Sequence, residues 1–246
     1  MSFAIACQDL KFDNIDAVIF DKDGTLENSA AYWRTVAKER ARLIDAQIPG
    51  VGEPLIMAFG ILDNVLDPTG LMAVGTRREN EIAAAAYIAE TGKSWHESKK
   101  IAESAFCEVA ESKYLTKTAN SAPLYDDAKK TLQSLATKGL KLAVVSADST
   151  VAVKNFVDNH QLQDYIQHYI GVDDDISKPD PQLLVQVCEY LEVSPQKTLM
   201  VGDSAEDMIM AKRAKAAGAI GICRHQNLRL DSADVQIDNL LKIRAL

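Results

Sequence analysis

Five short apolar segments, each followed by polar or glycine-containing sequence, constrain the fold of this chain more than any other feature. They are DAVIFD (16–21), KLAVVSA (141–147), HYIGV (168–172), TLMVGD (198–203) and AIGIC (219–223). Their shortness and their β-branched residues are typical of strands that are buried on both faces of a sheet. Helical patterns lie between the later segments, so strand and helix alternate with short connections. We therefore expect an α/β fold with a doubly wound parallel sheet.

The expected helices carry recognisable start and stop signals. The segment DPQLLVQVCEYL (180–191) has a proline directly after an aspartate, as at many helix starts. Two further helical segments, DDAKKTLQSLATKG (126–139) and AEDMIMAKRAKAAG (205–218), close on Gly139 and Gly218. Glycine is the preferred residue just after a helix. We therefore expect one helix that begins after Asp180 and two helices that end at Gly139 and Gly218.

Residues 28–120 interrupt the alternation of strands and helices. This region contains three long helical patterns and no convincing strand: YWRTVAKERARLIDAQ (32–47), RRENEIAAAAYIAETG (77–92) and SWHESKKIAESAFCEVAESKYL (94–115). We expect an all-helical domain over residues 28–120, inserted into a loop of an α/β domain formed by residues 1–27 and 121–246.

The net charge of the chain limits its partners. Its formal value is -8, and nucleic acid and anionic membranes both repel an acidic surface at long range. We expect neither as a partner. An anionic small molecule would have to be held by local positive side chains or by a bound cation.

The cysteines and the absence of long apolar segments predict a cytoplasmic protein. Cys7, Cys107, Cys188 and Cys223 are scattered without a CxxC pair, which favours reduced thiols. No segment reaches the roughly 18 apolar residues of a membrane span, and the first residues do not resemble a secretion signal. We therefore expect neither secretion nor membrane insertion, and a homodimer is left open as an assembly state.

Polar residues stand at or just after the expected strand ends, where open parallel sheets bind their ligands. They are FDKDGTL (20–26), Ser146, Lys178 in SKPDP, and GDSAED (202–207). Taken singly, each is more simply explained as a turn, a helix cap, a surface charge or a favourable helix start. Their joint occurrence in this order favours one site that handles phosphate.

These residues resemble the four signature motifs of the haloacid dehalogenase (HAD) superfamily, in the correct order and spread over residues 20–207. The matching elements are DKDGT, Ser146, the Lys178-Pro179 pair and GDSxxD. The helical insert resembles the C1-type cap of the phosphoglycolate phosphatase-like branch. The resemblance implies a HAD-like Rossmannoid core, and it is specific for fold and chemistry but weakly specific for substrate.

The resemblance also implies a division of catalytic labour. Asp21 would be the nucleophile that forms an aspartyl-phosphate. Asp23 would be the general acid that protonates the leaving group and then the base that activates water. Ser146, the backbone of Ala147 and Lys178 would bind phosphoryl oxygens, and Lys178 would also orient Asp21.

A magnesium site follows from the same resemblance. Mg²⁺ prefers an octahedron of oxygen ligands. The family pattern supplies them from the Asp21 carboxylate, the Asp23 backbone carbonyl and Asp203, with Asp207 as a nearby partner. The cation would let anionic Asp21 approach an anionic phosphate.

Two acids refine this interpretation. Dehalogenases of the superfamily lack an aspartate at the position of Asp23, because a halide leaving group needs no proton, so Asp23 favours phosphoryl transfer. Asp148 stands where relatives often have a neutral or basic residue. It would either weaken anion binding or cap the next helix, and we expect the cap.

The insert is expected to select the substrate. In relatives with a C1 cap, a loop between cap helices reaches over the active site, and the candidate here is DPTGLMAVGTRRE (67–79). Arg77 or Arg78 would bind a carboxylate or a second phosphate on the leaving group. The alternative is that both are solvated residues in the first turn of a helix.

The sequence thus predicts a magnesium-dependent phosphatase acting on a small phosphorylated metabolite, either a phosphoglycolate-like acid or a sugar phosphate. A phosphomutase of the β-phosphoglucomutase type is the nearest alternative, because it would use the same aspartate pair. A phosphorylation-dependent signalling module is a more distant one. Receiver domains are about half this length and carry their acidic pair and phospho-acceptor on different strands.

Overall fold

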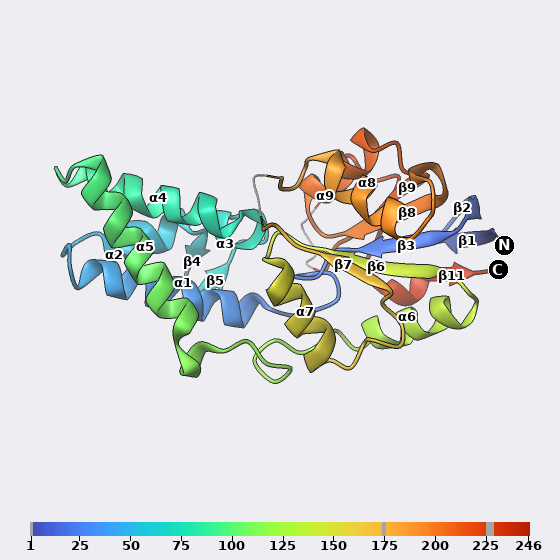
Figure 1. The fold of residues 1–246 in the computed structure, drawn as a ribbon, viewed down its shortest axis with the longest axis horizontal. Coiled ribbons are helices and arrows are strands. Elements are labelled where there is room, and N and C mark those ends of the chain that lie inside the picture. Colours follow the sequence, from blue (N-terminus) through green and yellow to red (C-terminus); the bar gives the residue numbers. More distant parts are fainter. Residues whose placement is uncertain (1, 174–175, 225–228) are drawn as a thin grey trace. The chain divides into compact units, whose positions relative to one another are not determined.

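The computed structural model describes residues 2–173, 176–224 and 229–246, and the chain divides into two compact units (Figure 1). The first, here called the α/β unit, consists of Met1–Asn28 and Pro123–Leu246. The second, here called the insert, is Ser29–Ala122.

A parallel sheet forms the centre of the α/β unit. Its strands are β3 (Ala17–Phe20), β6 (Lys141–Val145), β7 (His168–Ile170), β8 (Thr198–Gly202), β9 (Gly218–Ile222) and β10 (Val235–Ile237). They are ordered β10-β9-β8-β3-β6-β7, and every neighbouring pair is parallel. The five apolar segments of the sequence supply five of these strands, which confirms the predicted parallel sheet. The sequence analysis did not predict β10.

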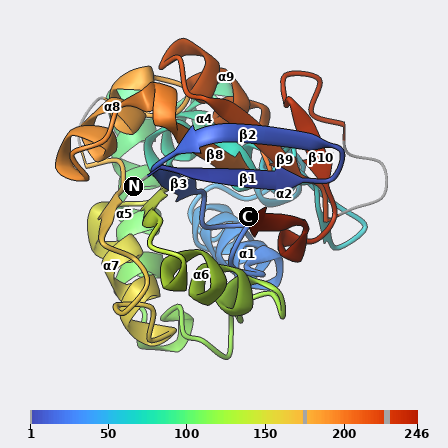
Figure 2. The same ribbon diagram turned by 90° about the vertical axis from the view of Figure 1, so that its right-hand side faces the viewer.

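Successive strand residues face two different apolar layers. In β3, Val18 and Phe20 belong to the layer that contains α6 (Ala128–Thr137) and α7 (Thr150–Asn159). The other β3 residues belong to the layer with α8 (Pro181–Tyr190) and α9 (Ala205–Arg213). Figure 2 shows these helix pairs on opposite sides of the sheet. Burial on both faces explains why the strands are continuously apolar.

Of the three predicted helix boundaries, one start and one end agree with the structure. The helix α8 begins after Asp180, whose carboxylate accepts a hydrogen bond from the Gln182 N–H at 2.8 Å. The helix α6 is followed by Gly139 with a φ of +97°. The prediction that the last helix runs to Gly218 is wrong, because α9 ends at Arg213 and Gly218 opens β9. A Cβ atom on Gly218 would lie 2.4 Å from the Phe12 ring, so this glycine permits close packing.

A small antiparallel sheet, absent from the sequence predictions, joins segments from the two ends of the described chain. It contains β1 (Phe3–Cys7), β2 (Leu10–Ile15) and β11 (Ile243–Ala245), in the order β11-β1-β2. Two 3₁₀ turns, Pro195–Lys197 and Leu240–Lys242, complete the regular elements of this unit.

The insert has its own apolar core, which its helices share. They are α1 (Ala30–Asp45), α2 (Gly52–Ala58), α3 (Leu71–Val74), α4 (Arg77–Glu90), α5 (Trp95–Glu111) and a 3₁₀ turn, Lys113–Leu115. The expectation of an all-helical insert is wrong in one detail, a hairpin of β4 (Ile61–Leu62) and β5 (Val65–Leu66). Its two-residue loop, Asp63-Asn64, has φ values of +48° and +63°. Aspartate and asparagine tolerate such values, which the tight hairpin turn requires.

Among the residues that the structure describes, no helix combines the length and apolar character needed to cross a membrane.

Candidate active site

The segment after β3 folds into a tight turn that faces the end of β8. The Asp21 N–H donates to the Val201 carbonyl at 2.8 Å, and two later N–H groups of the turn donate to the Lys22 carbonyl. Gly24 has a φ of +76°, and a Cβ atom there would lie 1.8 Å from Asp203 Oδ2. Glycine is therefore required at this position both for its backbone conformation and for the close approach of Asp203.

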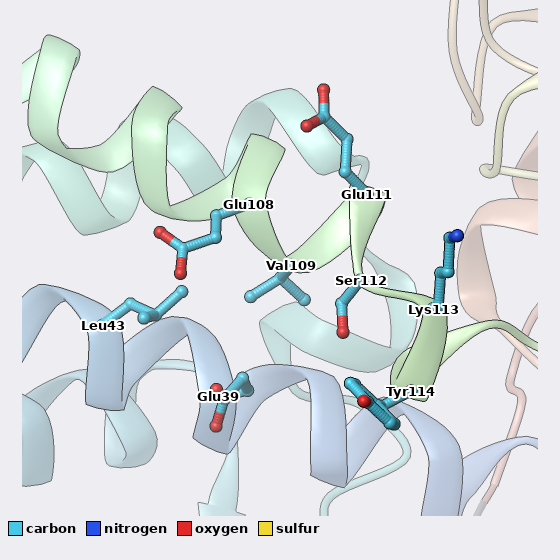
Figure 3. Close-up of a pocket in the computed structure, with 8 residues that line it drawn as sticks. All are labelled: Glu39, Leu43, Glu108, Val109, Glu111, Ser112, Lys113 and Tyr114. Atoms are coloured by element: carbon cyan, nitrogen blue, oxygen red, sulfur yellow. The ribbon is translucent and has the colours of Figure 1, made fainter.

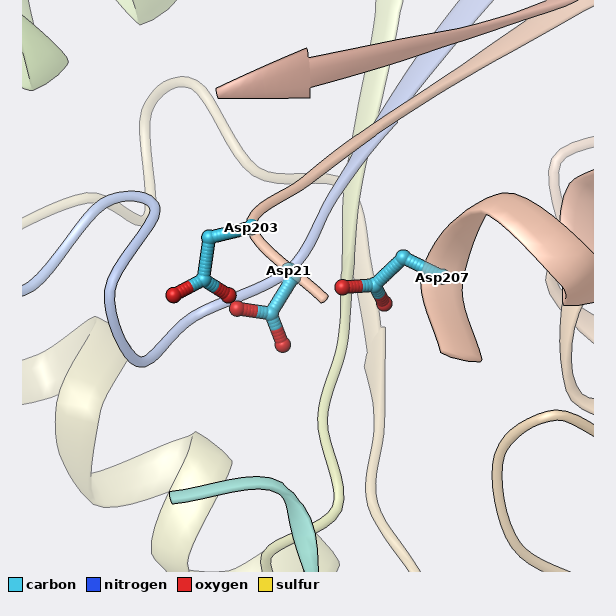
Figure 4. A group of neighbouring side chains, drawn as sticks. All are labelled: Asp21, Asp203 and Asp207. Atoms are coloured by element: carbon cyan, nitrogen blue, oxygen red, sulfur yellow. The ribbon is translucent and has the colours of Figure 1, made fainter. Parts of the chain in front are cut away.

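Three acids converge next to this turn. Asp21 follows β3, Asp203 follows β8, and Asp207 lies in the first turn of α9. Each offers a carboxylate oxygen within 4.8 Å of the others, and Figure 4 shows the three side chains pointing toward a common region. Asp21 and Asp207 are buried and Asp203 is half-buried. The carboxyl edge of the parallel sheet brings these distant residues together, as its topology predicts.

Lys178 lies between two of these acids. Its Nζ atom is 2.5 Å from Asp21 Oδ1 and 2.7 Å from Asp207 Oδ1. Burial disfavours its ammonium, but Asp207 and Asp21 outweigh that effect and hold the pKa of Lys178 above its ordinary value. Lys178 is therefore a permanent cation that fixes the orientation of the Asp21 carboxylate.

Asp207 also anchors the start of α9. Its Oδ2 atom accepts hydrogen bonds from the Ser204 hydroxyl at 2.7 Å and from the Ser204 N–H at 3.3 Å, while Ser204 Oγ accepts from the Asp207 N–H. This arrangement is a capping box. One carboxylate oxygen of Asp207 pairs with Lys178 and the other accepts hydrogen bonds from Ser204. Asp21 and Asp203 are therefore better placed to ligate a cation.

The electrostatics of the acids fit a divalent cation. The pKa of Asp21 is raised to about 7, chiefly by burial and in part by Asp207 and Asp23, while Lys178 opposes the rise. Burial, then Asp21 and Asp207, raise the pKa of Asp203. Asp21 Oδ2 is buried and has no hydrogen-bond partner among the residues that the structure describes. An all-oxygen donor set with an unsatisfied buried carboxylate oxygen suits Mg²⁺, so the residues present fit this ion.

Ser146 lies directly after β6, the strand that pairs with β3. Its side chain is buried, its N–H donates to the Ile170 carbonyl at 3.1 Å, and its Oγ atom accepts from the Asp148 N–H at 3.1 Å. The hydroxyl keeps its own proton for donation to another group. Ala147, the other predicted phosphate-binding residue here, is half-buried.

A second buried lysine was not singled out by the sequence analysis. The Lys22 side chain is 1% exposed, and its Nζ atom contacts Asp23 Oδ2, Asp148 Oδ2 at 2.9 Å and Glu27 Oε2 at 3.6 Å. The other Glu27 oxygen lies 3.2 Å from Nε2 of the buried His160. A lysine between two acids at the end of a buried strand was the available signal, but one of its partners, Asp148, lies 126 positions away in the sequence.

The expectation that Asp148 caps the next helix is wrong. Ser149 is the N-cap of α7 and accepts a hydrogen bond from the Ala152 N–H at 3.3 Å. The Asp148 carboxylate is instead paired with Lys22. An ion pair with a buried ammonium is stronger than a cap that a neighbouring serine already provides.

Arg77 and Arg78 are the first two residues of α4 in the insert, and both are exposed. The helix start is fixed by a capping box between Thr76 and Glu79. The Arg77 guanidinium lies 3.3 Å from Cys107 Sγ and 3.8 Å from Glu81 Oε2. The structure thus places both arginines in a helical first turn, the arrangement that was the alternative to substrate binding.

The insert contains a pocket of about 560 Å³ between α1 and the end of α5 (Figure 3). Its lining includes three glutamates, Glu39, Glu108 and Glu111, and one lysine, Lys113. This lining repels phosphate groups. The acidic cluster of the α/β unit, with its two buried lysines, is therefore the candidate active site.

Comparisons with known proteins give one family and several relatives. The haloacid dehalogenase-like hydrolase family matches residues 15–215. The phosphoglycolate phosphatase of Escherichia coli (strain K12) is 28% identical over 217 residues, which are 85% of this chain and 80% of that protein. The phosphoglycolate phosphatase of Yersinia pestis is 28% identical over 218 residues, which are 87% of this chain and 83% of that protein. A HAD phosphatase from Thermococcus onnurineus has a similar fold, with a TM-score of 0.66 and 21% identity. The match covers 93% of this chain and 95% of that one.

We predict that Mg²⁺ stabilises the protein more at pH 8 than at pH 5.5. The pKa of Asp21 is raised to about 7 in the folded chain, above its value in an unfolded chain, so without metal the stability from this group falls as the pH rises from about 4 to 7. Mg²⁺ binds the ionised carboxylate and reverses this loss. At a concentration 100 times its Kd it should add about 2.7 kcal/mol, or about 5–10 °C in Tm, at pH 8. Thermal unfolding with and without MgCl₂ measures this difference.

The Asp203→Asn variant is the control, because it removes a proposed ligand and should abolish most of the magnesium-dependent shift. An equal shift at both pH values, or a full shift in this variant, would contradict the assignment of the metal to these acids.

Proposed function

The chain belongs to the haloacid dehalogenase-like hydrolases, and on that premise we propose that it is a magnesium-dependent phosphatase acting on a small phosphorylated metabolite. Asp21 would be the nucleophile and would form an aspartyl-phosphate. The observation that carries this proposal is the buried group at the sheet edge, in which Lys178 holds Asp21 beside Asp203.

The proposed reaction begins at Asp21. A phosphate monoester is hydrolysed very slowly without catalysis, so the site must orient a nucleophile in line with the leaving group and neutralise negative charge. Lys178 donates to Asp21 Oδ1 at 2.5 Å and thereby fixes the carboxylate, and its own charge attracts phosphoryl oxygens. Asp21, the Asp23 carbonyl and Asp203 would hold Mg²⁺, with Asp207 nearby. When bound, the ion supplies charge neutralisation that lets anionic Asp21 meet an anionic phosphate.

Asp23 would transfer protons in both half-reactions. It lies two residues after the nucleophile, in the same turn, and its side chain is 19% exposed. Such partial exposure leaves the carboxylate accessible to a leaving-group oxygen and to water. Asp23 would donate a proton to the leaving alkoxide and then accept one from the water that attacks the phosphoenzyme.

Ser146 and Ala147 would complete the phosphate site. The Ser146 hydroxyl, which accepts from the Asp148 N–H, can still donate its own proton to a phosphoryl oxygen. Together with the ammonium of Lys178 it would replace the water that solvates the phosphate in solution.

We further propose a phosphoglycolate-like acid or a sugar phosphate as the substrate. Two relatives at 28% identity are phosphoglycolate phosphatases, which supports the first class. The free state of all four cysteines, each within the described residues, supports a reducing, cytoplasmic location. A phosphomutase would use the same acids, but it would return the phosphoryl group to its product.

We predict that a screen of phosphorylated metabolites will detect release of inorganic phosphate, and that Asp21→Asn will lower kcat by several orders of magnitude. The substitution keeps the side-chain volume but removes the nucleophile. The matched control is Asp126→Asn at an exposed position, which should keep full activity. Isomerised product without free phosphate would indicate a mutase, and appreciable activity of purified Asp21→Asn would indicate another nucleophile.

We predict that Asp23→Asn will affect substrates according to their leaving groups. Alkyl phosphates need a proton on the leaving oxygen, so their kcat should fall by about 10²–10⁴-fold. The first step with p-nitrophenyl phosphate should suffer less, because p-nitrophenolate is a stable anion. Slow dephosphorylation should then produce a burst of p-nitrophenol and a mass increase of one phosphoryl group after acid quench. Equal losses for both esters, without accumulated phosphoenzyme, would mean that Asp23 has only a positional role.

We predict that Arg77→Ala or Arg78→Ala will lower kcat/KM for the best natural substrate by about 10-fold or more, which corresponds to one charge-assisted hydrogen bond. The value for p-nitrophenyl phosphate, which offers no second anion, should change little. Steady-state kinetics on both substrates, with Arg42→Ala on α1 as a control, measure this selectivity. Equal effects on both substrates would leave Arg77 and Arg78 as solvated residues of the first turn of α4.

A further inference from the structure

We propose that Lys22 is a positioning residue for Asp23, and that it acts through a buried ion-pair network with Asp148 and Glu27. This inference rests on the proposed acid and base role of Asp23. It assigns a function to a residue that lies between the two acids of the DKD sequence and that pairs with Asp23, Asp148 and Glu27.

The position of Lys22 lets it act on the turn through both its backbone and its side chain. Its carbonyl accepts hydrogen bonds from the Leu26 N–H at 2.9 Å and the Glu27 N–H at 3.0 Å, which closes the turn that carries Asp23. Its ammonium contacts the Asp23 carboxylate directly. A single residue thus sets both the path of the backbone around Asp23 and the direction of its side chain.

The network has enough negative charge to hold the Lys22 ammonium in one place. Burial disfavours a charged lysine, but the carboxylates of Asp23, Asp148 and Glu27 surround the Lys22 ammonium and offset that cost. Glu27 is 2% exposed and also contacts His160. Because a buried ammonium needs these partners, it cannot swing away without leaving charges unpaired.

The same network explains the acid at position 148. A carboxylate two residues after Ser146 would repel a phosphate that binds there. Its Oδ2 atom lies 2.9 Å from Lys22 Nζ, so the lysine compensates its charge. Lys22 and Asp148 are therefore complementary, although 126 positions separate them in the sequence.

The two buried lysines contact different acids. Lys178 contacts Asp21 and Asp207, whereas Lys22 contacts Asp23 and its neighbours. Each of the two acids with a proposed chemical role is thus oriented by its own ammonium. Loss of Lys22 should disturb proton transfer by Asp23 and leave the orientation of Asp21 intact.

The test is the substitution Lys22→Met, which keeps a long unbranched side chain but removes the charge. The kcat for the best alkyl phosphate should fall by about 10–100-fold, as for a misplaced catalytic group. The first step with p-nitrophenyl phosphate, followed as the burst of p-nitrophenol in a single turnover, should slow by less than about threefold, because p-nitrophenolate leaves without a proton. The substrate concentration that gives half of the maximal first-step rate should stay within about twofold for both esters, because Lys22 is not proposed to bind phosphate. In an Asp23→Asn background, Lys22→Met should cause no further change in the ratio of the two first-step rates.

Two further variants separate positioning from folding. Lys22→Met combined with Asp148→Asn removes one charge of each sign, so it should recover thermal stability without recovering the ratio of alkyl to p-nitrophenyl activity. Lys141→Met is the matched control, since Lys141 is a part-buried lysine at the start of β6 that donates to the Leu191 carbonyl. It should lower Tm without changing that ratio.

The outcomes distinguish this inference from the proposed function. If Asp23→Asn shows no dependence on the leaving group, the acid role of Asp23 is wrong. If Asp23→Asn shows that dependence but neither Lys22→Met nor the double variant does, Lys22 only balances buried charge and the positioning role is overturned. A change in the ratio that is as large in Lys141→Met would also overturn it.

Discussion

Repulsion between carboxylates at one edge of the parallel sheet is the constraint on which the rest of the site depends. Asp21, Asp203 and Asp207 offer oxygens within 4.8 Å of one another, and burial removes the water that would otherwise screen them. Burial and this repulsion raise the pKa of Asp21 to about 7. The protein tolerates the arrangement because Lys178 compensates part of the charge and because a divalent cation can compensate more. Under our proposal, a bound cation would balance buried charge as well as take part in the chemistry.

The backbone of the turn after β3 is shaped so that these acids can lie close together. Gly24 adopts a left-handed conformation and lets Asp203 approach to a distance that a Cβ atom would prevent. The carbonyl of Lys22 closes the turn by accepting two hydrogen bonds, and its ammonium pairs with Asp23 and Asp148. The two lysines therefore divide one acidic region into two networks, one around Asp21 and one around Asp23. This separation matches the two chemical tasks that we propose for Asp21 and Asp23.

Several parts of this organisation could be predicted from the sequence alone. The strands were recognisable because both faces of the sheet are covered, which gives the strands continuous apolar runs, as in LAVV (142–145) and LMV (199–201). The candidate acids, Ser146 and Lys178 were recognisable because polar residues that follow such strands must gather at one edge of a parallel sheet. The hairpin at Asp63-Asn64 and the pairing of β1 with β11 could not be predicted from the sequence, since short strands are stabilised by partners that local sequence does not specify.

The sequence by itself determined five strands of the parallel sheet and the helices between the later ones, and its motifs placed the candidate site residues at strand ends, because periodicity and position along the chain are local properties. Only the tertiary structure decided which charges meet. Asp148 could cap a helix or pair with a cation, and the choice depended on Lys22, which reaches it only after β3 and β6 align side by side. Ion pairs between distant residues form only where the fold brings their charges together and excludes water.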